Sequence, residues 1–272
     1  MKVIEVKAFH CNFIGNKMGI RCLGHTKGGK WITKEGRLME MQALGDTGVR
    51  IHFGEEIDEK IHKQIQRYCG ALQEKRLKGV IEWVPSYTAV SVYYRPDQIS
   101  FSQLKKKLLS IQEEATSLPE GESRSVDIPV VYGGEYGPDL DAVARHARLT
   151  PDEVIAIHSQ GSYLVYMMGF VPGFPYLGGM DPTIATPRLK KPRSVIPVGS
   201  VGIAGGQTGI YPLETPGGWR LIGRTPIRLY DPHRKQPMFL QTGDQITFTP
   251  ITVQEYDEMT TSEERGSGGV HK

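Results

Sequence analysis

Aromatic side chains stand among turn-forming residues between 169 and 223, and they offer the clearest binding chemistry in the sequence. This segment holds 12 of the 32 glycines and 8 of the 18 prolines. Gly permits positive φ and Pro fixes φ, so together they build rigid turns. Phe170, Phe174 and Tyr176 lie within seven residues there and could wall a flat ligand. A barrel with many tight turns is the alternative explanation for the glycines and prolines.

A basic cluster follows in the segment Pro187–Arg193, where prolines flank the charges. Guanidinium groups held on such a rigid loop suit bidentate capture of a carboxylate or phosphate. We therefore take Arg188 and Arg193 as candidate anion-binding residues. The alternative is a basic loop that is only solvated.

The glycine-rich stretch from Pro197 to Gly209 is a third motif. It lacks the Gly-Lys-Ser/Thr ending of a Walker A loop, and no helix follows it as in a dinucleotide fingerprint. We expect two strands joined by a glycine turn, with polar and aromatic groups close to it. The candidate substrate- or nucleotide-binding residues are Phe170, Gly173, Phe174, Tyr176, Ser200, Gly202, Gly205, Gln207, Thr208, Thr215, Gly218, Trp219 and Arg224.

His158 is the leading candidate for a general acid/base. It stands near the end of a helix predicted to begin at Thr150, a few residues before the strand that leads into the aromatic segment. Its unperturbed pKa near neutrality suits proton transfer. A histidine at a helix end is also favoured by the helix dipole, and that structural role is the alternative. Neither a serine-hydrolase elbow nor an HExxH motif is present.

Residues 39–122 are predicted to form an α+β domain. Alternation indicates strands at 49–53, 80–84 and 89–94, and two amphipathic helices separate and follow them. The order β-α-β-β-α, with one more strand expected, favours a ferredoxin-like sandwich. The apolar stripes of the two helices are Ile57, Ile61, Ile65, Tyr68 and Leu72 in the first, and Phe101, Leu104, Leu108 and Ile111 in the second.

Residues 123–255 are predicted to form a second, mainly-β domain after a linker. A strand at 126–132 precedes two short helices, and the second helix has a capping signature in Thr150, Pro151 and Glu153. Short strands broken by Gly and Pro then continue to about Phe248, which is typical of a barrel or compact sandwich. We expect residues 256–272 to be a disordered tail.

Residues 1–38 carry no sustained periodicity, and we expect them to lie outside the fold, with the natural start near Met39 or Met41. The alternative is an N-terminal arm in which His10, Cys11, Cys22 and His25 bind a metal, although their spacing fits no compact zinc pattern. We predict no metal on this chain.

The bulk composition excludes several classes of protein. A net charge of +3 without dense basic patches does not suggest nucleic acid binding. There is no apolar run of about 18 residues, so no membrane span is predicted. No signal-peptide pattern opens the chain, and three widely spaced cysteines argue for a reducing cytoplasm.

Several motifs resemble the KipI/PxpB family of 5-oxoprolinase subunits, also known as allophanate hydrolase subunit 1. The similarity runs from about 41 to 255. The residues that carry it are Met41–Thr47, Val131–Leu140, His158, Gly173–Gly179, Pro197–Gly202, Gln207–Gly209 and Thr215–Trp219.

This resemblance implies a cyclophilin-like barrel in the second domain. It also implies an ATP-dependent 5-oxoprolinase that works with a homologous PxpC-type subunit and a PxpA-type protein, so that this chain would be inactive alone. ATP would be the co-substrate. From the chemistry of such a reaction we assign catalytic roles to His158, Arg188 and Arg193, and we expect Arg224 to join the two arginines in stabilising the transferring phosphate. Inhibition of a sporulation histidine kinase, or a role in an allophanate hydrolase or urea carboxylase system, is the alternative that the resemblance leaves open.

Overall fold

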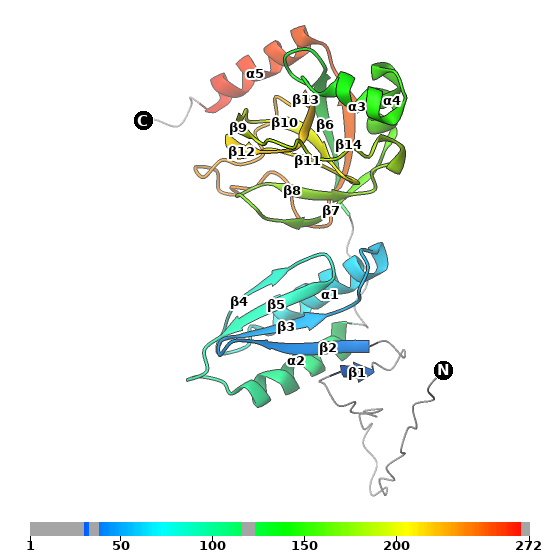
Figure 1. Ribbon diagram of the computed structural model, residues 1–272. Coiled ribbons are helices and arrows are strands. Elements are labelled where there is room, and N and C mark those ends of the chain that lie inside the picture. The colour runs from blue at the N-terminus through cyan, green and yellow to red at the C-terminus, as the bar shows by residue number, and fades with distance from the viewer. Residues whose placement is uncertain (1–29, 33–37, 116–122, 268–272) are drawn as a thin grey trace, which may run out of the picture.

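The computed structural model describes residues 30–32, 38–115 and 123–267 (Figure 1). Its first domain is an antiparallel sheet of strand order β1-β2-β3-β5-β4 with two helices packed on one face. The elements are β1 (Lys30–Ile32), β2 (Leu38–Leu44), β3 (Gly48–His52), α1 (Glu59–Lys75), β4 (Val80–Pro85), β5 (Ala89–Tyr94) and α2 (Phe101–Ala115).

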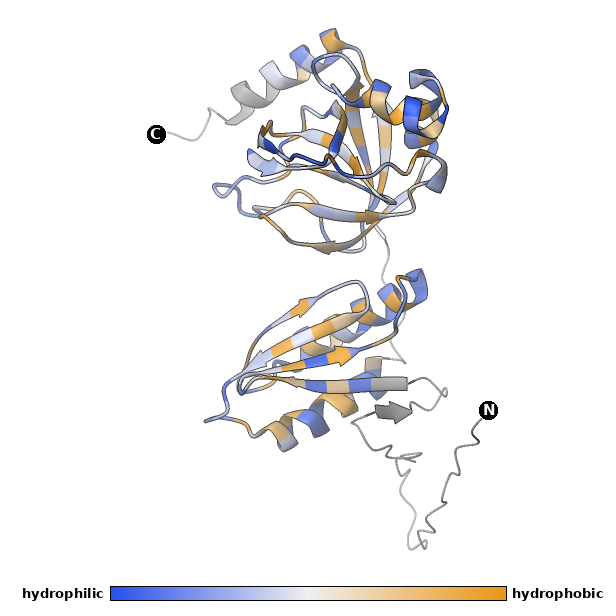
Figure 2. Cartoon of the chain, viewed as in Figure 1, coloured by the Kyte–Doolittle hydropathy of each residue, from blue (hydrophilic) through white to orange (hydrophobic). Residues whose placement is uncertain are grey.

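The predicted apolar stripes form the interior of this domain. In β3, Val49 and Ile51 are buried whereas Arg50 between them is exposed, as the period of two requires. Helix α1 begins at an N-cap, where the Asp58 carboxylate accepts the N–H of Lys60 at 2.7 Å. Ile57 therefore precedes the helix and is 53% exposed, so its assignment to the apolar stripe is wrong. Figure 2 shows polar and apolar residues alternating along α1 and α2.

The observed topology differs from the predicted ferredoxin-like order. The β-α-β-β-α unit is present as β3-α1-β4-β5-α2. Strand β3 has β5 on one side and β2 on the other. Strand β2 precedes β3 in a hairpin with the register Met41↔Ile51. The next described strand after α2 is β6 of the second domain, and no strand described beyond α2 joins this sheet. The extra strand is thus supplied from the N-terminal side, because the hairpin turn at Gly45 brings β2 directly beside β3.

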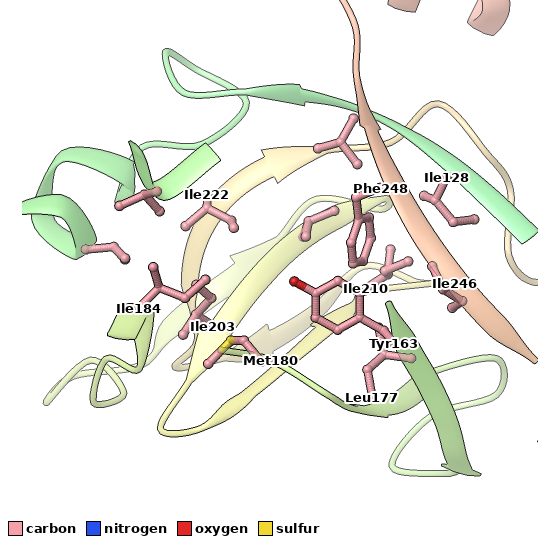
Figure 3. Close-up of a cluster of buried hydrophobic side chains, with 14 of the residues drawn as sticks. Ile128, Tyr163, Leu177, Met180, Ile184, Ile203, Ile210, Ile222, Ile246 and Phe248 are labelled. Atoms are coloured by element: carbon pink, nitrogen blue, oxygen red, sulfur yellow. The ribbon is translucent and has the colours of Figure 1, made fainter. Parts of the chain in front are cut away.

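The second domain is a closed barrel of order β10-β11-β8-β7-β14-β6-β13. Its interior is filled by aliphatic side chains around Tyr163 and Phe248 (Figure 3). A separate two-stranded sheet, β9 with β12, lies outside the barrel. The strands are β6 (Ser125–Tyr132), β7 (Tyr163–Met168), β8 (Pro175–Gly178), β9 (Arg193–Ile196), β10 (Ser200–Ala204), β11 (Gln207–Ile210), β12 (Thr215–Gly217), β13 (Arg220–Arg224) and β14 (Gln245–Pro250).

Two helices, α3 (Leu140–Ala147) and α4 (Pro151–Gln160), follow β6 and precede β7 in the chain, and they pack beside each other (Figure 1). The predicted capping box is present in α4: the Glu153 N–H donates to the Thr150 hydroxyl at 3.3 Å, and the Glu153 carboxylate accepts the Thr150 N–H at 2.7 Å. A short 3-10 turn, Pro182–Ile184, follows β8.

The expected disordered tail is wrong for most of its length. Helix α5 spans Val253–Ser267. A second capping box begins it: the Thr252 N–H donates to the Glu255 carboxylate at 2.7 Å, and the Glu255 N–H donates to the Thr252 hydroxyl at 3.2 Å. Tyr256 then packs on Tyr136, with ring centroids 4.9 Å apart.

Part of the N-terminal extension belongs to the first sheet, because β1 pairs with β2 in the register Trp31↔Met39. The proposed metal ligands His10, Cys11, Cys22 and His25 lie outside the described residues. Among the residues that the structure does describe, no helix is long and apolar enough to cross a membrane.

Candidate functional site

A largely buried aromatic cluster, separate from the main barrel interior, brings together two of the sequence motifs. We define it as Phe174, Tyr176, Tyr211 and Trp219. The Phe174 ring lies at its centre, edge-on to the other three rings at centroid distances of 5.2, 5.3 and 5.5 Å. Edge-to-face contacts of this kind are favourable for aromatic rings. The predicted aromatic segment and the Trp219 motif therefore form one site.

Two glycines of the barrel wall form the floor under this cluster. A Cβ on Gly209 would lie 3.0 Å from Trp219 Cζ3 and 3.1 Å from Phe174 Cζ, and one on Gly202 would lie 3.2 Å from Trp219 Cβ. A methyl group at either position would require its neighbours to shift by a few tenths of an ångström. Gly209 and the predicted binding residue Gly202 thus permit close aromatic packing, and Gly202 is buried beneath Trp219.

Phe170 extends the cluster toward solvent. Its side chain is 62% exposed, and its ring stands edge-on to Phe174 at 5.6 Å. The backbone adopts a φ of +66° there, which is costly for a residue with a bulky side chain. The tight turn around it is closed by the Gly169 N–H, which donates to the Phe174 carbonyl at 3.1 Å. An exposed aromatic held at a backbone cost is typical of a binding surface.

The three predicted arginines do not form one anion clamp. Arg188 is exposed, and its guanidinium carbon lies 5.9 Å from the centre of the Trp219 ring. Arg193 forms an ion pair with Asp139 in which both N–O distances are 2.9 Å, and the contact from Nη2 to Oδ1 is also a hydrogen bond. Arg224 instead stacks over Tyr136 at 5.4 Å. A carboxylate already neutralises Arg193, so Arg188 is the cation best placed to bind an anion beside the aromatic cluster.

Tyr211 is a site residue that the sequence reasoning missed. It is 1% exposed, and burial raises the pKa of its hydroxyl to about 12, although the Trp219 N–H and the Arg188 charge oppose that shift. The phenol therefore stays protonated at neutral pH. Tyr211 stands two positions after Gly209 and directly before Pro212, so it repeats the mixture of aromatic, Gly and Pro residues around Phe170. That repeated composition is the sequence feature that could have identified Tyr211 as a site residue.

His158 lies in the barrel interior and does not contact the aromatic cluster. It is 0% exposed, with Nδ1 2.8 Å from the Tyr132 hydroxyl and Nε2 2.9 Å from the Thr208 hydroxyl. Burial lowers its pKa to about 3, so the ring is neutral. The Phe248 ring packs on it at 4.5 Å. An imidazole with both nitrogens bonded inside a core cannot reach a substrate, so the predicted acid/base role does not fit this geometry.

The remaining candidate residues range from fully buried to exposed. Ser200 is fully buried in β10, and its hydroxyl has no partner among the described residues. Thr215 is half-buried in β12, while Gly205 is exposed in the β10–β11 turn with a φ of +60°. Gly173 has a φ of +83° and supports the turn before Phe174.

Two more contacts involve predicted site residues near the aromatic cluster. The Gly218 carbonyl accepts the N–H of Leu189 at 2.7 Å and so ties the basic loop to the Trp219 segment. The Gln207 amide donates to the hydroxyl of Tyr87 from the first domain. Among the described residues, no group of three or more His, Cys, Asp or Glu side chains could hold a metal.

Comparison with known proteins places the chain in a family. Residues 39–240 match the family model of the carboxyltransferase domain, subdomain C and D. The B component of the 5-oxoprolinase of Bacillus subtilis (strain 168) is 44% identical over 227 residues, which are 80% of this chain and 95% of that protein. The chain belongs to the KipI/PxpB family of 5-oxoprolinase subunits.

A second member of this family, the corresponding 5-oxoprolinase component of Escherichia coli O157:H7, is 42% identical over 76% of this chain and 94% of its own length. Among solved structures, TTHA0988 matches with a TM-score of 0.67 and 37% identity over 75% of this chain. This chain spans only 40% of TTHA0988. Kluyveromyces lactis urea carboxylase shares the fold, with a TM-score of 0.68 and 21% identity over 86% of this chain and 24% of that one.

The family match contains the whole aromatic cluster together with Arg188, and it starts at Met39. Residues 1–38 precede the matched region. That these residues are dispensable stays a prediction, because β1 contributes an edge strand to the first sheet.

Proposed function

We propose that this chain is the PxpB-type component of an ATP-dependent 5-oxoprolinase, which opens the lactam of 5-oxoproline to glutamate in the cytoplasm. One observation carries the proposal: the chain aligns with 95% of the length of the Bacillus subtilis 5-oxoprolinase component, at 44% identity. An alignment that covers nearly a whole component of the enzyme includes its binding surfaces as well as its fold.

The aromatic cluster and Arg188 suit such a substrate. 5-Oxoproline is a small, nearly flat ring with one carboxylate. Phe170 is exposed and Tyr176 is half-buried, so both could contact the faces of a ring. The guanidinium of Arg188 stacks on Trp219, and a stacked arginine can still bind a carboxylate or phosphate through its N–H groups. Because Tyr211 stays protonated, its hydroxyl adds no negative charge beside Arg188.

The chemistry of the lactam explains why a cation and ATP are needed. The amide is a poor electrophile, so we propose that its oxygen takes the terminal phosphoryl group of ATP and ADP leaves. A first water attacks the amide carbon that bears this phosphorylated oxygen. The C–N bond then breaks as the nitrogen takes a proton, and an acyl phosphate remains. A second water releases glutamate and phosphate. Arg188 would stabilise the negative charge of the transferring group.

We propose that the chain is inactive alone. Phe170 and Arg188 are exposed to solvent beside the buried rings of the aromatic cluster. Phosphoryl transfer in bulk water loses the electrostatic advantage of an enclosed site. A PxpC-type subunit would cover these residues, and a PxpA-type protein would complete the reaction.

The test is reconstitution from purified proteins. The chain is co-purified with the PxpC-type subunit of the same organism and mixed with the PxpA-type protein, and ATP hydrolysis and glutamate formation are measured with and without 5-oxoproline. We expect turnover that needs all three proteins, and none with urea in place of 5-oxoproline. A complex that ignores 5-oxoproline, or a chain that inhibits histidine-kinase autophosphorylation without any such turnover, would overturn the proposal.

A further inference from the structure

The first domain reaches the barrel through the turn between β4 and β5. This turn is tight, because the Ser86 N–H and hydroxyl both donate to the Ala89 carbonyl, at 2.7 and 3.0 Å. Tyr87 stands at its tip. Its hydroxyl accepts a hydrogen bond from the Gln207 amide of β11. A residue of the first domain thus contacts a predicted site residue of the second.

The ring of Tyr87 contacts the aromatic cluster as well. Its centroid lies 6.1 Å from that of Tyr176, edge-to-face, and 5.7 Å from that of Tyr166. Tyr176 in turn packs against Phe174 at the centre of the cluster. Burial, followed by the neighbouring Tyr176, raises the pKa of Tyr87 to about 12. The phenol is therefore neutral at any working pH, and its bond to Gln207 does not depend on titration.

Helix α1 holds the first domain against the barrel beside this turn. The Gln66 amide donates to the Thr242 carbonyl at 3.3 Å. The His62 ring is 1% exposed and lies edge-on to Tyr166 at 4.9 Å. Tyr166 itself is packed so closely over Gly178 that a Cβ there would lie 2.2 Å from the ring. Two separate elements of the first domain, α1 and the β4–β5 turn, therefore fix where Tyr87 stands.

We propose that Tyr87 is a positioning residue, which the first domain contributes to the binding site on the barrel. It holds the Gln207 amide and the Tyr176 ring in the orientation that receives the lactam substrate. A primary amide carries a donor and an acceptor that complement a lactam N–H and C=O, and one hydrogen bond to Tyr87 fixes which way it faces. This inference rests on the proposed 5-oxoprolinase function.

The test uses the assembled complex and three variants. Tyr87→Phe keeps the ring and removes the bond to Gln207, Gln207→Leu removes the amide, and the third variant combines both. The control is Tyr68→Phe, which removes a buried hydroxyl bond of 3.1 Å to the Leu108 carbonyl inside the first domain. We expect Tyr87→Phe to raise KM for 5-oxoproline about threefold to tenfold, the effect of one hydrogen bond, with kcat nearly unchanged. Tyr68→Phe should leave KM unchanged.

The double variant separates positioning from general destabilisation. If Tyr87 acts through Gln207, adding Tyr87→Phe to Gln207→Leu raises KM no further. Fully additive effects on KM, or an equal effect of Tyr68→Phe, would overturn the proposal.

A second readout needs no activity and keeps the inference separate from the proposed function. Amide hydrogen exchange of the isolated chain should become faster at 170–178 and 205–211 in Tyr87→Phe, and remain as in the wild type in Tyr68→Phe. If the wild-type complex ignores 5-oxoproline, the proposed function fails, and this exchange still decides whether Tyr87 orders the site. Unchanged exchange in Tyr87→Phe would overturn the positioning role.

Discussion

The carboxylate of Asp139 accepts a hydrogen bond from Arg193 Nη2 at 2.9 Å, forms an ion pair with Nη1 at 2.9 Å, and also accepts the N–H of Leu221 at 2.8 Å. Asp139 is 7% exposed. Three segments of the second domain are joined at this one carboxylate: the start of α3, β9 and β13. Arg193 therefore stabilises the fold, and its positive charge is neutralised by Asp139.

Replacing Arg193 should lower stability more than it lowers anion binding. Arg193→Ala leaves Asp139 buried beside only an N–H donor, so we expect the free energy of unfolding to fall by about 1.5–3 kcal/mol. Arg193→Lys should restore part of it, because a lysine cannot form the bidentate fork. Urea unfolding of both variants measures this. A variant with wild-type stability and a raised KM would return Arg193 to the binding site.

Arg188 should show the opposite behaviour. It is exposed, so Arg188→Ala should leave the melting temperature unchanged and raise KM at least about tenfold, the effect of losing a charge-assisted bond. Arg188→Lys should recover only part of the loss, since it stacks poorly on Trp219. Lys191→Ala is the control for net charge on the same loop and should change KM less than twofold. Equal effects of Arg188→Ala and Lys191→Ala would mean that only overall charge matters.

His158→Ala should cost stability and spare turnover. It removes a buried ring and strands the hydroxyls of Tyr132 and Thr208, so we expect a loss of about 2–4 kcal/mol. The folded fraction, assayed at low temperature in the complex, should keep kcat within a few fold. Val154→Ala, one turn earlier on the same buried face of α4, is the matched cavity control. A loss of about a hundredfold in kcat with stable folding would instead support a general acid/base.

Gly209→Ala tests the glycine floor of the aromatic cluster. The added methyl would lie 3.0 Å from the Trp219 ring, so we expect a destabilisation of about 1–3 kcal/mol from overpacking and a shift in tryptophan fluorescence. Gly206→Ala is the control, because nothing lies within 4 Å of its Cβ position, and it should change stability by about 0.5 kcal/mol or less. Identical stability of the two variants would contradict the packing role.

Stability should fall as the pH drops from about 6.5 toward 4. Burial lowers the pKa of His62 to about 4 and that of His158 to about 3, whereas both should titrate near 6.5 in the unfolded chain. In this window the unfolded state binds more protons, so protonation favours unfolding by at most about 1.4 kcal/mol per pH unit for each histidine. Above pH 7 the effect vanishes.

The measurement is urea unfolding at pH 5, 6 and 7, where the lowered pKa values of Glu153 and Asp181 contribute little because those carboxylates are ionised in both states. His62→Phe should reduce the slope of stability against pH by roughly half, since one of the two buried histidines is removed. A slope that is zero in the wild type, or unaffected by the variant, would show that His62 is not buried as a neutral ring.

Periodicity was enough to predict the elements whose signals are local. The α1 stripe at Ile65, Tyr68 and Leu72 forms the interior of the first domain, and the capping box at Thr150 begins α4 as expected. Helix α5 was missed although Thr252 and Glu255 carry the same capping signal. The prediction of a disordered tail instead followed the polar and glycine-containing composition of residues 262–269, which overlap the end of α5.

The parts that could not be predicted depend on partners far along the chain. From the sequence alone, Arg193 belongs to a basic cluster that suggests anion binding. Only the structure shows that it pairs with Asp139, which lies 54 residues earlier in the chain. His158 is a neutral core residue only because Thr208 and Tyr132 close around it. The residue Tyr87 shows no functional pattern in its own domain, and only the docked barrel connects it with Gln207. Local pattern identifies chemical types, and tertiary contact decides what they do.

The parallel pairing of β6 with β14 has a consequence for synthesis on the ribosome. The register runs from Ser125↔Gln245 to Val130↔Pro250, so the barrel cannot close until its last strand has been translated and has left the exit tunnel. The first domain, whose last helix ends at Ala115, can fold long before that. Pairs of high sequence separation form late and slowly. The nascent chain therefore carries a finished first domain, with Tyr87 at its tip, beside an open barrel that has yet to form the surface on which Tyr87 docks.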